Sequence, residues 1–326
     1  MLAVEISSFG SADVLKPVER PKPAPQPDEI VIRVQAAGVS RADVLQRQGK
    51  YPPPPGASDI PGLDVSGVVE EIGAAVATFR PGDPVCAILA GGGYAEFCAV
   101  PAIQALPIPS GWTPVEAATL PENIFTVYDN LVTRAALRGG ETVLIHGGTS
   151  GIGSLAVMLA RAWSALPIAT AGAQPKCEAC LQFGAARAIN YKESDFSAEV
   201  LRLTSGRGVD LILDMVGGPY LDRNLDSLAV EGRLVIVAVQ GGRTAPLEIH
   251  KLMIKRARVL GSTMRARTPA QKGVIAQRLL LDVWPLLPAR NPIRPLVDCT
   301  FPLRDAALAH QHMESGAHIG KIVLTT

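Results

Sequence analysis

Residues 121–265 alternate between short apolar runs and segments with helical periodicity. The apolar runs are rich in aliphatic and β-branched residues, which is typical of strands buried on both faces of a parallel sheet. The strands expected on this basis are Thr142–His146, Pro167–Ala171, Ala188–Asn190, Val209–Asp214, Arg233–Val237 and Val259–Thr263. The helices expected between them are Ser154–Trp163, Gln174–Phe183, Ser197–Thr204, Tyr220–Ala229 and Pro246–Arg256. This alternation predicts a doubly wound α/β domain, which binds ligands at the carboxyl ends of its strands.

The first 120 residues have a different pattern, in which short strands alternate with turns. The strands expected here are Ile30–Ala36, Val65–Ile72, Pro84–Leu89 and Tyr94–Val100. This pattern predicts an all-β unit of the partly closed barrel type. Near the end of the chain we expect helices at Pro269–Val283 and Arg304–Ser315 and a strand at Gly320–Thr325, and this segment is long enough to pack back on the first unit. We therefore expect residues 1–120 and 266–326 to form one domain and residues 121–265 the other.

A glycine-rich loop, ETVLIHGGTSGIG, joins the expected strand Thr142–His146 to the helix that follows it. Backbone N–H groups at such a strand-to-helix turn can hold a pyrophosphate at the positive end of the helix dipole. Glycines allow the phosphate to approach the backbone closely. The spacing is not a strict G-x-G-x-x-G, and a tight turn without a ligand is the alternative. Because the strand and the helix are both present, we interpret the loop as part of a dinucleotide site.

The end of the second expected strand indicates which dinucleotide binds. Sites selective for NAD usually place Asp or Glu there, to accept a hydrogen bond from the ribose 2′-hydroxyl. This chain has no carboxylate over residues 171–176, and Lys176 could attract a 2′-phosphate. Tyr191 follows the next strand and could flank the same pocket. The alternative is that Lys176 is an ordinary solvated lysine and Tyr191 a surface aromatic, but together with the missing acid they favour NADPH.

Composition excludes several classes of function. The chain has 326 residues, of which 48% are hydrophobic, and a formal net charge of +1, without the basic run that a nucleic-acid-binding protein would carry. It has neither an evident signal peptide nor an apolar segment long enough to span a membrane, so we expect a cytoplasmic protein. Its five cysteines include a C-x-x-C at Cys177–Cys180, which has no second pair to complete a zinc site.

Several motifs along the chain resemble those of a known family. They include residues 37–43 (AGVSRAD), 46–51 (QRQGKY), 61–67 (PGLDVSG), 92–96 (GGYAE), the glycine-rich loop and residues 319–324 (IGKIVL). Together they resemble the medium-chain dehydrogenase/reductase superfamily, in its zinc-independent, zeta-crystallin-like quinone oxidoreductase branch and the stress-induced subgroup of that branch. The resemblance covers nearly the whole chain. It implies a GroES-like barrel domain and a Rossmann domain with NADPH lying between them, in a homodimer or homotetramer.

Zinc members of this superfamily carry a ligand cysteine and a His-Glu pair at positions that here hold Ser40 and Leu63-Asp64. Serine and leucine do not replace a thiolate and an imidazole as zinc ligands. Without a Lewis acid, reduction of an electron-poor quinone or enone is easier than oxidation of an alcohol. Related proteins often have Asn in place of Ser40 and Ser in place of Ala173.

The resemblance also implies roles for particular residues. Tyr51, at the head of a four-proline run, would face the acceptor, and Ser150 would help to position cofactor or acceptor; these are the two candidate catalytic residues. The expected cofactor-binding residues are Ser40, Thr126, Gly148, Thr149, Ser150, Gly151, Ile152, Gly153, Gly172, Lys176, Tyr191, Val216, Gly217, Ala238, Val239, Gln240, Met264, Arg265 and Lys321. The alternatives are an enone or enoyl-thioester reductase of the same fold, and a protein that binds NADPH without turnover.

Overall fold

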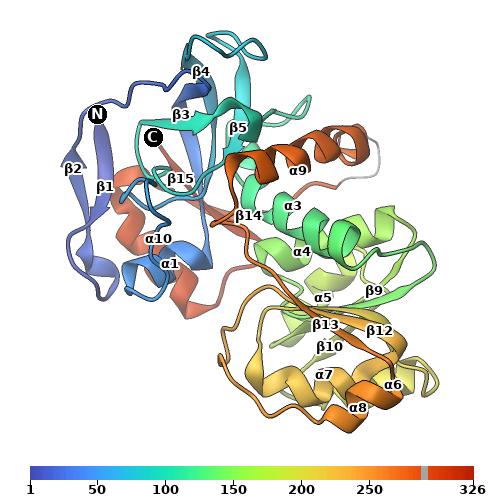
Figure 1. Ribbon diagram of the computed structural model, residues 1–326. Helices are drawn as coiled ribbons and strands as arrows, with labels where there is room; N and C mark the ends of the chain where they lie inside the picture. Colours follow the sequence, from blue (N-terminus) through green and yellow to red (C-terminus); the bar gives the residue numbers. More distant parts are fainter. Residues whose placement is uncertain (288–292) are drawn as a thin grey trace. The chain divides into compact units, whose positions relative to one another are not determined.

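The computed structural model describes residues 1–287 and 293–326, and the chain divides into two compact units (Figure 1). One unit is continuous, Thr126–Thr263, and we call it the Rossmann unit. The other combines Met1–Phe125 with Met264–Thr326, and we call it the β-rich unit. The units divide after Phe125 and Thr263, whereas the sequence placed the divisions after residues 120 and 265. Residues 288–292 of the expected C-terminal segment lie outside the described residues.

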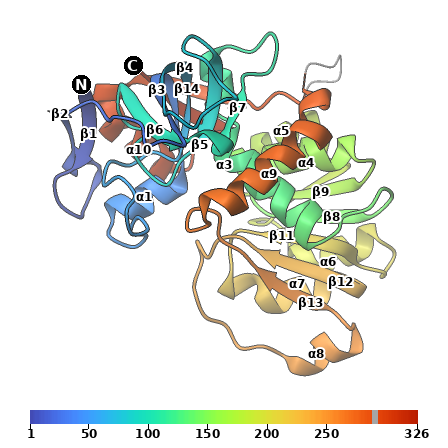
Figure 2. The ribbon, with the colours of Figure 1, turned by 45° about the horizontal axis from the view of Figure 1, so that its top comes forward.

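The Rossmann unit contains a six-stranded parallel sheet in the order β10-β9-β8-β11-β12-β13. Figure 2 labels β8, β9, β11, β12 and β13 of this sheet. The chain enters at the centre, builds outward through β9 and β10, and then returns to build the other half. The strands are β8 (Thr142–Ile145), β9 (Leu166–Ala171), β10 (Arg187–Asn190), β11 (Val209–Asp214), β12 (Leu228–Ile236) and β13 (Arg258–Gly261). The helices are α4 (Gly151–Ala162), α5 (Gln174–Gln182), α6 (Phe196–Leu203), α7 (Leu221–Ser227) and α8 (Ile249–Ile254). The predicted doubly wound sheet is confirmed, and its strand order reverses between β8 and β11, where such folds bind dinucleotides.

The strands of this sheet are apolar because helices cover them. Leu144 in β8, Ile168 in β9 and Ile212 in β11 belong to one buried cluster with Phe196 and Val200 of α6. A strand covered on both faces has no solvent-facing positions, so its sequence is a continuous apolar run. This is why periodicity located most of these strands to within a residue or two.

The start of β12 was wrong in the sequence prediction. The strand begins at Leu228, not at Arg233, and α7 accordingly ends at Ser227. Val230 and Glu231 are exposed, and Glu231 has a positive φ of 65°. The polar and conformationally irregular residues from Glu231 to Arg233 interrupt the apolar pattern of the strand. The sequence pattern therefore assigns the first half of the strand to the end of the preceding helix.

The β-rich unit contains a seven-stranded sheet and a separate hairpin of β1 and β2. The strands are β1 (Leu2–Ile6), β2 (Leu15–Glu19), β3 (Glu29–Val39), β4 (Asp64–Ile72), β5 (Pro84–Ile88), β6 (Phe97–Pro101), β7 (Ala105–Pro107), β14 (Val297–Pro302) and β15 (Lys321–Thr325). The helices are α1 (Arg41–Arg47), α2 (Pro114–Ala117), α3 (Pro121–Tyr128, which crosses the division), α9 (Pro269–Asp282) and α10 (Ala306–Ser315). The seven-stranded sheet runs in the order β14-β15-β3-β4-β5-β7, with β6 paired to β3.

Antiparallel pairing of β15 with β3 brings the end of the chain to the N-terminal segment. Ile322 lies opposite Val39, and Thr325 lies opposite Ala36. In Figure 1 these strands lie side by side, β15 in red and β3 in blue. The pairing places Lys321 beside the start of α1, where several predicted site residues lie. Among the described residues, no helix is both long enough and apolar enough to cross a bilayer.

Candidate functional site

The glycine-rich loop leads from β8 into the N-terminus of α4, as predicted. Ser150 is the N-cap of this helix, and its Oγ accepts a hydrogen bond from the N–H of Gly153 at 3.0 Å. Gly151 and Ile152 are the first two residues of the helix, so their N–H groups have no acceptor within it. These N–H groups are the donors that a pyrophosphate would use. The structure therefore gives Ser150 a definite local role, to cap the helix that presents these donors.

Two glycines of the loop are required by close packing. A Cβ on Gly153 would lie 2.2 Å from the carbonyl oxygen of Gly147. A Cβ on Gly148 would lie 2.7 Å from the sulfur of Cys180. The buried Cys180 of the C-x-x-C thus packs against the loop, and burial raises the pKa of its thiol to about 12. The loop is held close to β9 and α5, and larger residues at these two positions would push it outward.

The residues expected at the adenosine end of the cofactor lie together after β9. A Cβ on Gly172 would lie 2.5 Å from the Tyr191 hydroxyl, so this phenol packs directly on the glycine. Lys176 is half-buried in the first turn of α5. The N-cap of α5 is Ala173, whose side chain cannot cap the helix. A helix N-terminus without a side-chain cap, next to a lysine and without a carboxylate over residues 171–176, fits an anionic group.

The loops after β11 and β12 also meet. The N–H of Gly241 donates to the carbonyl oxygen of Val216 at 2.8 Å, and Gln240 donates in the same way to Met215 at 3.2 Å. A Cβ on Gly217, whose φ is +83°, would lie 2.9 Å from the Cα of Val239. The structure therefore brings Val216, Gly217 and residues 238–240 together at the edge where β8 and β9 also end.

A buried hydrogen-bond chain that the sequence did not predict supports this edge. His146 Nδ1 lies 3.0 Å from Thr170 Oγ1, and its Nε2 lies 2.8 Å from Asn224 Oδ1. Asn224 donates in turn to Asp214, which also accepts from the N–H of Val216 at 2.6 Å. Burial lowers the pKa of His146 to about 4 and raises that of Asp214 to about 6. The chain links the ends of β8, β9 and β11 through α7.

Thr126 begins the Rossmann unit and carries an unsatisfied polar atom. Its Oγ is buried and has no hydrogen-bond partner among the described residues. Leaving a buried hydroxyl without a partner costs about 1–3 kcal/mol. A polar ligand group would remove this cost, which fits the expectation that Thr126 bonds near the nicotinamide ribose.

In the β-rich unit, Ser40 and Lys321 belong to a buried charged cluster. The Lys321 ammonium donates to Ser40 Oγ and to Asp64 Oδ2, both at 2.7 Å. Ser40 also donates to Asp64 at 3.1 Å, and its Oγ lies 3.5 Å from Glu122 Oε2. Ser40, Asp64 and Lys321 are each at most 5% exposed. The predicted residues Ser40 and Lys321 therefore contact each other and two carboxylates.

This cluster lies where zinc members of the resembled superfamily have metal ligands. The structure places a lysine ammonium between Ser40 and Asp64, and Leu63 is buried beside them. An ammonium has no lone pair to donate and repels a divalent cation. The donor set therefore does not fit zinc.

Carboxylates around Lys321 have altered proton affinities. Burial raises the pKa of Glu122 to about 7 and that of Asp43 to about 6, although the charge of Lys321 lowers both. Burial alone would lower the pKa of Lys321, but Asp64, Glu122 and Asp43 outweigh it and raise the pKa above its usual value. Lys321 thus remains charged, and it is the counter-ion of the cluster.

Tyr51 is positioned by Arg265. The guanidinium of Arg265 donates to the backbone oxygen of Tyr51 at 3.2 Å, and its Cζ lies 5.3 Å from the centre of the Tyr51 ring. It also donates to Ala90 O at 2.8 Å and to Gln46 Oε1 at 2.7 Å. Burial raises the pKa of the Tyr51 phenol, so the phenol remains a hydrogen-bond donor at neutral pH. Arg265 and Met264 belong to the β-rich unit, and these contacts of Arg265 are all within it.

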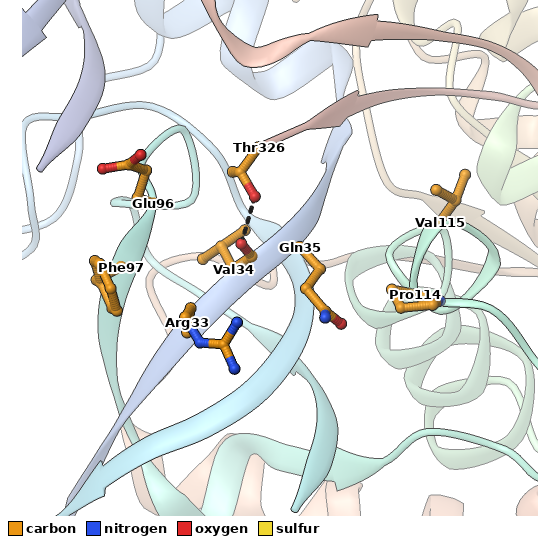
Figure 3. A pocket seen from close by; sticks show the side chains of 8 residues that line it. All are labelled: Arg33, Val34, Gln35, Glu96, Phe97, Pro114, Val115 and Thr326. Carbon is orange, nitrogen blue, oxygen red and sulfur yellow. Dashed lines mark hydrogen bonds between the residues drawn. The ribbon is translucent and has the colours of Figure 1, made fainter. Parts of the chain in front are cut away.

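A shallow hollow of about 560 Å³ lies beside the C-terminus of the β-rich unit. Figure 3 shows Arg33 and Gln35 of β3 on one side of it and Pro114 on the other. The Thr326 hydroxyl donates to the carbonyl oxygen of Val34 at 2.5 Å. None of the predicted site residues lines this hollow.

Glu122, Asp43 and Gln46 contact predicted site residues but had no predicted role themselves. Asp43 had a detectable local signal, because Ser40 and Asp43 have the spacing of a capping box at the start of α1. Glu122 and Gln46 had none, since their partners come from distant segments.

Two family models match the chain, Zinc-binding dehydrogenase over residues 151–277 and Alcohol dehydrogenase GroES-like domain over residues 26–110. The curated quinone oxidoreductase of Rattus norvegicus is 30% identical over 327 residues, which cover 99% of this chain and 97% of that protein. The structure of Escherichia coli quinone oxidoreductase complexed with NADPH is 27% identical, with a TM-score of 0.87 and full coverage of both chains. A mycobacterial protein complexed with NADPH is 29% identical, with a TM-score of 0.88 and full coverage of both chains.

Proposed function

Because the chain belongs to the medium-chain dehydrogenase/reductase superfamily, we propose that it reduces quinones with NADPH and does so without zinc. The superfamily's two-domain fold, a GroES-like domain and a Rossmann domain, is shared by this chain. The observation that carries the proposal is the buried Lys321 ammonium, 2.7 Å from both Ser40 and Asp64. A site that holds an ammonium in place of a Lewis acid suits an acceptor that is already electron-poor.

The Rossmann unit supplies the residues that would hold NADPH. The N–H groups at the start of α4 would bind the pyrophosphate, and Lys176 with the start of α5 would bind the 2′-phosphate. Thr126 would donate to, or accept from, the ribose that the nicotinamide carries. When bound, NADPH supplies the reducing equivalents for the acceptor. The relatives complexed with NADPH support this choice of cofactor.

Tyr51 would act on the acceptor as a hydrogen-bond donor. As an acceptor oxygen gains negative charge, a phenol O–H directed at it stabilises that charge. Arg265 contacts the backbone oxygen and the ring of Tyr51, and these contacts would position the ring before the acceptor binds. The raised pKa keeps the proton on the phenol under assay conditions.

Purified protein is expected to oxidise NADPH with 1,2-naphthoquinone, to contain no stoichiometric zinc, and to keep its rate when EDTA is added. Absorbance of NADPH measures the rate, and elemental analysis measures the metal. About one zinc per chain together with loss of rate in EDTA would refute zinc independence. Faster turnover of a crotonyl thioester than of the quinone would favour the enoyl-thioester reductase. No turnover of either acceptor would leave a protein that only binds NADPH.

Tyr51→Phe is expected to lower kcat with quinones by about tenfold or less, and with enones by more. Phe retains the ring beside Arg265, so this variant removes only the hydroxyl. Tyr51→Ala removes the ring as well and is expected to raise KM in addition. Steady-state kinetics with both acceptor classes measures these effects. Equal, negligible changes for Phe and Ala would remove Tyr51 from the site.

A further inference from the structure

A pocket of about 590 Å³ lies within the β-rich unit. Arg265, which contacts Tyr51, belongs to its lining, whereas Tyr51 itself does not. The segment Pro54–Ile60 forms one wall, and the turn Leu89–Gly92 and strand β6 form others. The chain from Arg265 to Pro269, with Lys272 of α9, completes it. A pocket of this size is in the range of about 300–1,000 Å³ that small-molecule sites usually have.

Lys272 is an unusual residue in this pocket. It is 1% exposed, and its ammonium has no hydrogen-bond acceptor among residues 1–287 and 293–326. The local fold fixes its position. A capping box of Thr268 and Gln271 starts α9, and the next residue after Lys272, Gly273, lies so close to Ile103 that a Cβ there would be 2.9 Å from the Ile103 side chain. Buried lysines are normally paired, since leaving an ammonium both buried and unpaired is costly.

The surrounding charges make this position more unfavourable. Lys272 lies in the first turns of α9, where the helix dipole repels a cation. Burial first, and then the charge of Arg265, lowers the pKa of Lys272 to about 8, so it is still mostly protonated at neutral pH. Arg265 is itself only 4% exposed and donates to two carbonyl oxygens and an amide oxygen, all of them neutral.

The two carboxylates in the pocket lining, Glu29 and Asp59, form no hydrogen bond or ion pair with Lys272 or Arg265. Asp59 pairs with Arg20 at 2.6 Å, and Glu29 accepts from the N–H of Gln26 at 3.0 Å. Lys272 is therefore a buried lysine in the pocket lining, and its ammonium has unused hydrogen-bonding capacity among the described residues.

We infer that this pocket binds an oxyanion (a carboxylate, sulfonate or phosphate) through Lys272, and that the oxyanion belongs to the acceptor. The link to the acceptor is Arg265, which lines the pocket and also holds Tyr51 through its backbone oxygen and ring. The volume exceeds what a bare inorganic ion needs, which favours an anionic group attached to a larger molecule. This last step rests on the proposed function, whereas the binding of an oxyanion does not.

The first experiment tests oxyanion binding without turnover. Sodium phosphate is titrated calorimetrically into protein saturated with NADPH, at constant ionic strength, so that the cofactor's own phosphate sites are filled. We expect saturable binding that Lys272→Met weakens by at least tenfold. We also expect Lys272→Met to raise the Tm, because it removes an unpaired buried charge; a purely structural lysine would give the opposite sign.

Lys255→Met is the matched control. The Lys255 ammonium donates to three backbone carbonyl oxygens at 2.6–2.7 Å, so its loss should lower the Tm and leave phosphate binding unchanged. Absence of phosphate binding to the wild-type protein, or equal binding to the Lys272→Met variant, would overturn the inference.

The second experiment assigns the source of the oxyanion. The ratio of kcat/KM for 1,2-naphthoquinone-4-sulfonate to that for 1,2-naphthoquinone is measured in both variants and in the wild type. We expect the ratio to fall about tenfold in Lys272→Met and to be unchanged in Lys255→Met. Phosphate binding through Lys272 with an unchanged ratio would overturn the acceptor assignment and indicate a site for a free oxyanion. If neither quinone is reduced, the proposed function fails while the calorimetric result still decides oxyanion binding.

Discussion

Lys321→Met is expected to lower the free energy of unfolding by about 3–5 kcal/mol, the usual cost of removing one partner from a buried ion pair. Lys321 is 4% exposed and its partner Asp64 is fully buried. Without the ammonium, Asp64 loses its counter-ion and lies close to the carboxylate of Glu122, since Ser40 contacts both. Chemical denaturation followed by circular dichroism measures the change.

Two further variants separate charge from packing. Lys321→Met with Asp64→Asn removes both charges, and we expect it to recover a large part of the lost stability. Lys22→Met is the surface control: Lys22 pairs with Glu70 and Glu71 at the surface, and its loss should cost much less stability than the loss of Lys321. A cost for Lys321→Met as small as that for Lys22→Met would show that the ammonium is not the counter-ion of the cluster.

Lys176→Ala is expected to weaken NADPH binding by about 1.5–3 kcal/mol, or roughly ten- to a hundredfold. The reason is the loss of one charge-assisted hydrogen bond to the 2′-phosphate, in a turn that has no carboxylate over residues 171–176. NADH lacks this phosphate, so its binding should change little. Fluorescence titration of the protein with each cofactor measures both dissociation constants.

Lys16→Ala is a suitable control, since Lys16 is exposed and belongs to the β-rich unit. It should leave both dissociation constants unchanged. A wild-type preference for NADH, or equal weakening of both cofactors by Lys176→Ala, would contradict the assignment of NADPH.

The two buried lysines, Lys321 and Lys272, differ in whether the protein itself supplies their counter-ion. Lys321 compensates carboxylates that are already present, so its removal is expected to destabilise the protein. Lys272 has no such carboxylate partner among the described side chains, so the compensating anion would arrive with a ligand. A structural cation and a binding cation are thus distinguished by the sign of their effect on stability.

Most of the Rossmann unit follows from the amino-acid sequence. Its central strands β8, β9 and β11 are largely buried, and helices alternate with the strands, so both types of element follow from patterns within a few residues. The glycine-rich loop and the turn without a carboxylate after β9 are also local features. For this reason the residues themselves were enough to locate the strand-to-helix loop at Gly148–Gly153, whereas the adenosine end at Gly172–Lys176 stays a prediction.

Burial of a polar residue was only partly visible in the sequence. Lys272 is three, four and seven positions from Ile275, Ala276 and Leu279, which form the buried stripe of α9. The spacing therefore places the lysine on the buried face, but a long side chain at the start of such a stripe often reaches solvent. The tertiary packing of α9, whose Gly273 lies against Ile103, determines that Lys272 is buried.

The charged cluster of the β-rich unit depends entirely on the tertiary structure. Lys321 and Ser40 are 281 positions apart, and Arg265 and Tyr51 are 214 apart. No local periodicity encodes such pairs, because they depend on which strands pair and in which register. The antiparallel register of β15 against β3 brings Lys321 to the start of α1. A shift of one residue in that register would turn the side chain to the other face of the sheet, and the counter-ion of Asp64 would be lost.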